Sequence, residues 1–306
     1  MLRHLRIADG KLLPADDGQG QIQVYIAPDE SERRYLVDTL KLDEHTLNSC
    51  LDPDELSRLE FEPEHVAMIY KRPRNYSSED QFLFKVASAG LFLFKDRLII
   101  ILGDDAPLFE GRGFVRIASL QDVVLRLIYR SVFHYEEHLR VINMISNQLE
   151  QEISTAMENK HLLNLFTLEK SLVYYVNAIS SNARLIEKLK VHAARLGFTV
   201  EHQEFLDDLI IENTQCHEQA NIYSQVLAGL MDARVSIVSN NLNLLMKTLT
   251  LIMIFIMTPQ LVVSIFSMNV LMPLNSESSM SFWLIMLMTT ASIIGVWLIM
   301  RYKKLH

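Results

Sequence analysis

The segment TLTLIMIFIMTPQLVVSIF, residues 248–266, contains no ionisable side chain, and the uncharged stretch continues to Ser276. After Glu277, a second stretch without ionisable residues runs from Ser278 to Met300. Each stretch can supply the roughly 20 apolar residues that cross a bilayer as a helix. Because only a short connection joins them, the sequence predicts a transmembrane helical hairpin.

The bounds of this hairpin follow from the flanking charges. We expect a first span at about 246–266, an outer loop at 267–281, a second span at about 282–300 and a basic tail at 301–306. Lysine and arginine gather on the cytoplasmic side of membrane spans, and here they lie at both outer ends of the hairpin: Lys247, Arg301, Lys303 and Lys304. We therefore expect a multi-pass protein of the cell (inner) membrane with both termini in the cytoplasm. A buried hairpin in a soluble protein is the alternative, but soluble cores rarely run so long without a charge.

The charged part of the chain divides into two regions. Residues 1–118 are typical of a cytosolic domain with a mixed sheet and helices, an α+β fold. We predict strands in 21–28, 64–72, 84–94 and 97–103, and short helices broken at Pro53 in 42–61. Residues 119–245 carry apolar side chains at three- and four-residue steps, which predicts long helices over 119–154, 161–196 and from Glu201 onward. Gly197 is the expected end of the second helix. The third helix would continue into the membrane region, 246–306.

Composition excludes several classes of function. The formal net charge of −8 disfavours nucleic-acid binding and favours attraction of cations. Cys50 and Cys216 lie far apart without metal-ligand spacing, as expected in a reducing cytosol. We find no phosphate-binding glycine loop, nucleophile elbow or HExxH motif, so we do not expect an enzyme. His134 and His138 have the i, i+4 spacing of a metal pair, but the sequence offers no third ligand nearby.

A polar stripe follows one face of the third helix. Its members recur at steps of three and four residues: Asp232, Ser236, Ser239, Asn243, Met246, Leu249, Met253, Met257, Gln260 and Ser264. Polar groups at membrane depth need partners or water. In one interpretation they hydrogen-bond to neighbouring helices. In the other they line a water-filled pore, which one two-span chain cannot enclose, so that a homo-oligomer is required.

Cyclic symmetry would convert each stripe residue into a ring. A ring of Asp232 carboxylates would concentrate cations, and a ring of Asn269 carbonyls would offer neutral acceptors. Mg²⁺ releases its waters reluctantly, so neutral oxygens could recognise the hydrated ion. Met246, Leu249 and Met257 would form apolar constrictions that resist wetting and gate the pore.

The segment SNNLNLLMKTLTLIMIFIMTPQLVVSIFSMN, residues 239–269, resembles the membrane-entry helix of the CorA family of divalent-cation transporters. The family's N-x-x-M-K-x-L-T segment corresponds to residues 243–250, its proline to Pro259 and its Y-G-M-N motif to residues 266–269. The acidic element DPD in 42–61 and the order of the long helices are also similar. The resemblance implies a funnel-shaped homopentamer that transports Mg²⁺, with the stripe lining an axial pore.

The resemblance also implies roles for individual residues. Ser267, Met268 and Asn269 would form the selectivity filter at the outer mouth, with Asn269 contacting the hydrated ion. Asp208 corresponds to a carboxylate that helps bind a regulatory Mg²⁺ between neighbouring subunits, although Asp207 is an equally acidic neighbour.

Two departures from the family motif leave the transported ion open. Ser267 stands where the family has glycine, which tolerates positive φ better than serine, and Phe266 replaces tyrosine. The outer loop has only one acid, Glu277. Co²⁺, Ni²⁺ or Zn²⁺ transport, as in a zinc-transporting branch of the family, and a non-conducting membrane-anchored sensor or scaffold are the alternatives.

Overall fold

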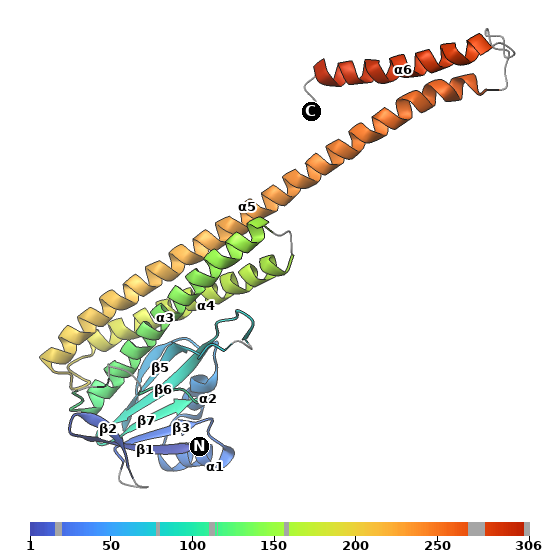
Figure 1. Cartoon of the computed structure of the whole chain (residues 1–306). Helices are drawn as coiled ribbons and strands as arrows, with labels where there is room; N and C mark the ends of the chain where they lie inside the picture. Colours follow the sequence, from blue (N-terminus) through green and yellow to red (C-terminus); the bar gives the residue numbers. More distant parts are fainter. Residues whose placement is uncertain are drawn as a thin grey trace. The chain divides into compact units, whose positions relative to one another are not determined.

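The computed structural model describes residues 1–15, 20–77, 80–109, 114, 116–155, 159–268 and 279–302. The chain forms two compact units, Met1–Met231 and Asp232–His306. The first unit contains a sheet and long helices, and the second contains two apolar helices (Figure 1). The expected class, an α+β domain followed by long helices and two apolar C-terminal helices, is confirmed. The expected division at residues 118 and 245 stays a prediction.

A seven-stranded mixed sheet forms the centre of the first unit, in the order β2-β1-β3-β7-β6-β5-β4. The strands are β1 (Leu2–Ala8), β2 (Lys11–Pro14), β3 (Ile22–Ile26), β4 (Arg58–Phe61), β5 (His65–Pro73), β6 (Val86–Phe94) and β7 (Leu98–Leu102). β3 and β7 pair in parallel, and the other neighbours are antiparallel. All four predicted strands are present, as β3, β5, β6 and β7.

Helices cover both faces of this sheet, which explains why β7 reads LIIIL without polar residues. Leu98, Ile100 and Leu102 pack in the larger core with α3 (Leu120–Thr155) and α4 (Asn159–Val191). Ile99 and Ile101 face the smaller core, to which the π-helical turn η1 (Tyr35–Thr39) and α2 (Glu44–Leu51) contribute. The short helix α1 (Glu30–Arg34) precedes η1 and has no buried residue. Figure 1 shows α3 and α4 beside the sheet.

Residues 42–61 were expected to form only short helices, and this is wrong for their second half. α2 is present, but Arg58–Phe61 forms β4, which pairs with β5 from Arg58↔Ile69 to Phe61↔Val66. Its four residues, RLEF, are too short to show a period of two, so pairing with β5 decides their conformation.

The long helices follow the predicted pattern with one shifted end. α4 ends at Val191, and a hydrogen-bonded turn leads to Gly197, whose φ of +70° lies in the left-handed region. Gly197 therefore closes the turn after the helix rather than the helix itself. α5 (Val200–Phe266) then begins, and its buried residues in the first unit include Leu206, Leu209 and Cys216.

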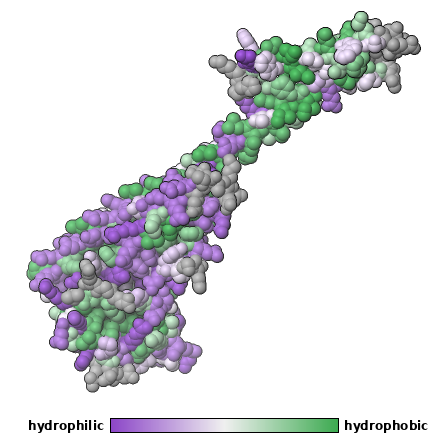
Figure 2. All heavy atoms as spheres, viewed as in Figure 1, coloured by the Kyte–Doolittle hydropathy of each residue, from purple (hydrophilic) through white to green (hydrophobic). Residues whose placement is uncertain are grey.

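The second unit consists of the last part of α5 and α6 (Ser279–Tyr302). Both helices are long and apolar enough to cross a membrane, and none of the most apolar window of either is buried within the chain. Figure 2 shows hydrophobic side chains covering the visible face of this unit, whereas hydrophilic ones predominate on the first. Apolar helices exposed to this degree are stable in a lipid environment.

Candidate functional site

The polar stripe predicted from the sequence lies entirely on α5. All of its members are exposed in the chain: Asp232, Ser236, Ser239, Asn243, Met246, Leu249, Met253, Met257, Gln260 and Ser264. A single uninterrupted helix therefore carries the acidic, the methionine-rich and the second polar part of the stripe.

The membrane part of the stripe lies on the side of α5 opposite to the residues that the chain itself covers. Between positions 246 and 266, the half-buried residues of α5 are Leu251, Phe255, Thr258, Pro259, Val262 and Phe266. At 3.6 residues per turn they occupy one face, and Met246, Met253 and Gln260 project from the other. On α6, the half-buried residues between 281 and 296 are Ser281, Ile285, Thr289, Ser292, Gly295 and Val296. The chain thus leaves the stripe available for contact with water or with other copies.

The three threonines in the membrane part of α5 are satisfied locally. The hydroxyls of Thr248, Thr250 and Thr258 donate to the carbonyls four residues earlier, at 2.9, 2.8 and 2.7 Å. By contrast, the Gln260 side-chain amide has no hydrogen-bond partner among the residues that the structure describes. An unsatisfied amide in hydrocarbon costs several kcal/mol. Gln260 therefore requires water or another chain at this depth.

The structure shows the conformation of Ser267 at the end of α5. Its N–H donates to the carbonyls of Val263 at 3.1 Å and Ser264 at 3.3 Å, and its Oγ donates to the Ser264 carbonyl at 2.9 Å. The residues with positive φ in the described ranges do not include Ser267. Serine therefore caps the end of α5 and does not need the left-handed conformation. Met268 follows and is exposed. Asn269 and Glu277 lie outside the described residues.

The two acidic residues of FLDDLII differ in their partners. Asp207 forms an ion pair with Lys190 of α4. Asp208 is exposed, and in the described ranges no ion pair or hydrogen bond engages its carboxylate. Of the two candidates, Asp208 is thus the carboxylate available to an ion.

His134 and His138 are close, with ring centroids 4.4 Å apart. His138 Nδ1 lies 2.6 Å from the Tyr175 hydroxyl. Burial lowers the pKa of each histidine to about 4, and for His134 the neighbouring Arg130 and Arg72 act in the same direction. Two guanidinium groups disfavour a metal cation, and the described residues contain no group of three metal-ligating side chains. This pair, with His138 buried and His134 half-buried, is a structural element.

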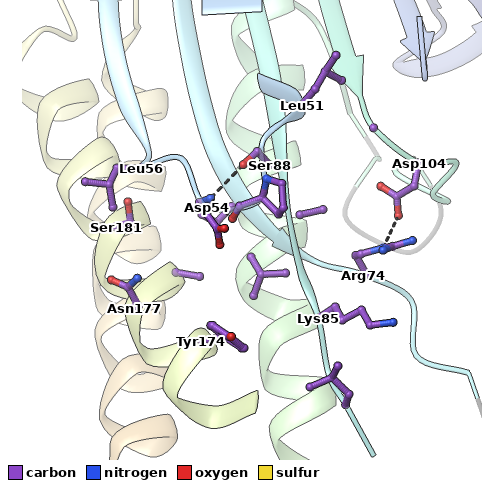
Figure 3. A pocket seen from close by; sticks show the side chains of 17 residues that line it. Leu51, Asp54, Leu56, Arg74, Lys85, Ser88, Asp104, Tyr174, Asn177 and Ser181 are labelled. Atoms are coloured by element: carbon purple, nitrogen blue, oxygen red, sulfur yellow. Dashed lines mark hydrogen bonds and ion pairs between the residues drawn. The ribbon is translucent and has the colours of Figure 1, made fainter. Parts of the chain in front are cut away.

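Sequence reasoning missed a cavity of about 490 Å³ in the first unit, between α4 and the sheet (Figure 3). Residues from several distant segments line it, among them Lys71 of β5, Ser88 of β6 and Tyr174 of α4. No local motif marks such a site. The only sequence signal is a lysine, Lys71, inside the buried strand HVAMIYKRP.

Comparison with known proteins then identifies the family. The model of the CorA-like Mg2+ transporter protein family matches residues 24–303, which is nearly the whole chain. The chain belongs to this family. It is therefore a membrane protein with two transmembrane helices and a CorA-like divalent-cation transporter. The expectation that it is not an enzyme is confirmed by this membership.

Individual relatives agree with this assignment. The cobalt/magnesium transport protein CorA of Methanocaldococcus jannaschii is 25% identical over 292 residues, 90% of this chain and 88% of that protein. The complete structure of a CorA magnesium transporter from the same organism has a TM-score of 0.80 at 20% identity, covering 98% of this chain and 96% of the other. The full-length CmaX protein has a TM-score of 0.71 at 15% identity, covering 99% and 97%. At these identities the two structures show the fold.

Proposed function

We propose that this chain transports Mg²⁺ through an axial pore lined by the α5 stripe of a homopentamer. The observation that carries the proposal is the position of Gln260 and the methionines on the face of α5 opposite to its half-buried residues. A helix that keeps an unpaired amide at membrane depth needs an aqueous or protein partner there. Because the M. jannaschii relative is named a cobalt/magnesium transport protein, Co²⁺ is included in the proposed range of ions.

In the proposed assembly, each stripe position forms a ring around the axis. Asp232 attracts cations at the cytosolic entrance. Further along α5 toward the membrane, polar contacts come from Ser236, Ser239 and Asn243. Met246, Leu249, Met253 and Met257 form narrow apolar zones that conduct only when wetted. Gln260 and Ser264 restore polar contacts near the outer end.

The outer mouth would select the ion. Ser267, Met268 and Asn269 form the proposed filter, in which amide oxygens of Asn269 accept hydrogen bonds from waters of the hydrated ion. The hydrogen bonds of Ser267 to the last turn of α5 support a defined approach to this filter. Both termini would lie in the cytoplasm of an inner-membrane protein.

A regulatory Mg²⁺ is proposed at Asp208, between neighbouring subunits. Support comes from its exposed carboxylate, which has no partner among the described residues, whereas Asp207 is engaged by Lys190. Oxygen ligands of this kind suit Mg²⁺. Occupation of the site would hold adjacent subunits together and favour a closed pore.

Ion uptake into proteoliposomes tests the proposal. The wild-type protein is expected to take up Mg²⁺, and Asn269→Ala should reduce uptake strongly. Asn275→Ala, which changes the same residue type in the same loop, is the matched control and should retain uptake. Mass measurement of the detergent-solubilised protein should give a pentamer, and a monomer or dimer would contradict the pore.

The same assay decides between the runner-up functions. If Zn²⁺ competes for Mg²⁺ uptake and is itself transported faster, the chain belongs to a zinc-transporting branch. If no divalent ion enters, the replacement of the filter glycine by Ser267 favours a membrane-anchored sensor or scaffold with the same fold.

A further inference from the structure

The cavity beside α4 has two kinds of wall. Its volume of about 490 Å³ lies within the range of roughly 300–1,000 Å³ typical of small-molecule sites. Leu56, Leu83 and Ala178 contribute apolar surface, and Ser181 and Asn177 of α4 contribute polar groups. Figure 3 shows Tyr174, Asn177 and Ser181 projecting from α4 on one side, with Arg74 and Lys85 on the other.

Lys71 supplies a buried charge to this cavity. The residue is only 4% exposed, and its Nζ donates to Ser88 Oγ at 3.0 Å and to the Pro53 carbonyl at 2.5 Å. Both acceptors are uncharged. In the described part of the chain no carboxylate pairs with this ammonium, which has three donors and therefore one left over. Burial lowers the pKa of Lys71, while the more distant Asp52, Asp54 and Glu55 oppose that shift.

The other charges around the cavity are already balanced or exposed. Arg74 Nε donates to Asp104 Oδ2 at 3.2 Å, and the same carboxylate binds Arg72. Lys85 Nζ contacts Asp80 at 2.9 Å, and Asp54 is exposed at the rim. Lys71 is therefore the one lining charge among the described residues that is both buried and without an opposite charge.

A buried, unpaired ammonium beside an open volume favours an anion and disfavours a cation. We propose that this cavity binds a small organic anion, with a carboxylate or phosphate group on Lys71 Nζ and an apolar part against Leu56, Leu83 and Tyr174. Such a ligand would bridge α4 and the strands β5 and β6, and would stabilise the first unit by binding only its folded state. This site is independent of the proposed pore, since all of its residues lie before position 182.

Two aromatic anions, phenyl phosphate and benzoate, test the proposed site. Benzyl alcohol is the uncharged aromatic control, and inorganic phosphate is the anionic control that lacks an apolar part. Binding to the full-length protein in detergent is followed by saturation-transfer NMR for the three aromatic probes and by thermal shift for all four. Phenyl phosphate, benzoate or both should bind saturably and raise the unfolding temperature. Benzyl alcohol and inorganic phosphate should each bind at least about tenfold more weakly, because each lacks one half of the recognition. The comparison of the two anions identifies whether phosphate or carboxylate is preferred.

Two variants localise the binding. Lys71→Met keeps a long, unbranched side chain but removes the ammonium, and should weaken anion binding by about tenfold or more. Ala178→Leu retains Lys71 but fills part of the cavity from α4, and should also weaken binding. This variant tests the proposal even if Lys71→Met fails to fold. Lys95→Met, at the exposed β6–β7 turn, is the charge-matched control and should bind as the wild type does. Equal binding of benzyl alcohol, unchanged binding by a folded Lys71→Met or Ala178→Leu variant, or no saturable anion binding up to about 10 mM would overturn the proposal.

Discussion

Asn182 of α4 pairs with the main chain of Lys71 as a neighbouring strand would. Its Oδ1 accepts the Lys71 N–H at 2.8 Å, and its Nδ2 donates to the Lys71 carbonyl at 2.8 Å. β4 begins at Arg58, which pairs with Ile69, so the antiparallel ladder between β4 and β5 does not extend to Lys71. The Asn182 side chain, 111 positions away in the sequence, takes the place of β4 on this edge of β5.

Asn182→Ala should therefore destabilise the first unit. The residue is fully buried, and its Oδ1 also accepts from Ser57 Oγ at 2.8 Å. Removing these partners leaves buried polar groups unsatisfied, at a cost of about 2–3 kcal/mol, or a drop of roughly 5–10 °C in unfolding temperature. Asn177→Ala, on the exposed side of the same helix, should change the temperature by little. Equal shifts for the two variants would contradict a specific role for Asn182.

Gly90 of β6 is predicted to resist substitution. A Cβ placed there would lie 2.3 Å from Cys50 Sγ and 2.9 Å from Cys50 Cβ. Gly90→Ala must therefore displace α2 from the sheet, at a cost of about 1–3 kcal/mol. In the Cys50→Ala background, the same change should cost less, because the sulfur is absent. Thermal unfolding of the four proteins in this cycle measures the coupling, and additive effects would show that the two residues do not interact.

The histidine pair predicts a loss of stability in acid. The pKa of each histidine falls from 6.5 to about 4 on folding, so the unfolded chain binds more protons between these values. Stability should be complete above pH 6.5 and decline as the pH falls from 6.5 toward about 4. Unfolding temperatures of the wild type and of a His134→Gln/His138→Gln variant, measured across this window, should show a shallower decline in the variant. Parallel curves would contradict the assignment.

Met257→Ser should increase basal Mg²⁺ flux severalfold if Met257 narrows a shared pore. Serine shortens the side chain and favours wetting of the apolar zone. Ile252→Ser is the matched control, since Ile252 is exposed on another side of α5. The hydroxyl of the introduced serine can donate to a carbonyl of the preceding turn. Proteoliposome uptake measures both. A larger effect of Ile252→Ser would place a different face toward the pore.

If a regulatory Mg²⁺ binds at Asp208, Asp208→Asn should remove the protection of the first unit by Mg²⁺ in limited proteolysis. The Mg²⁺ concentration that gives half protection is expected to rise about tenfold or more, because the amide is a weaker ligand than the carboxylate. Asp207→Asn should change it less, since that carboxylate is already held by Lys190. The reverse order would assign the regulatory site to Asp207.

Local features of the chain were predictable because they depend on composition and period. The membrane spans follow from the absence of charge over residues 248–266 and 278–300, and the α5 stripe follows from steps of three and four residues. The strand LIIIL was recognisable from its composition, because a short run of apolar residues is typical of a buried strand. β4 was not, because four residues with no clear period become a strand only by pairing with β5.

By itself, therefore, the sequence determined the two membrane spans and the face of α5 that carries polar groups. Only the tertiary structure decided that Asp207 is paired while Asp208 is available, that Ser267 caps α5 without positive φ, and that Lys71 lies buried beside a cavity. These outcomes depend on contacts between residues far apart in the chain or on the geometry of a helix end, and no local pattern of side chains encodes them.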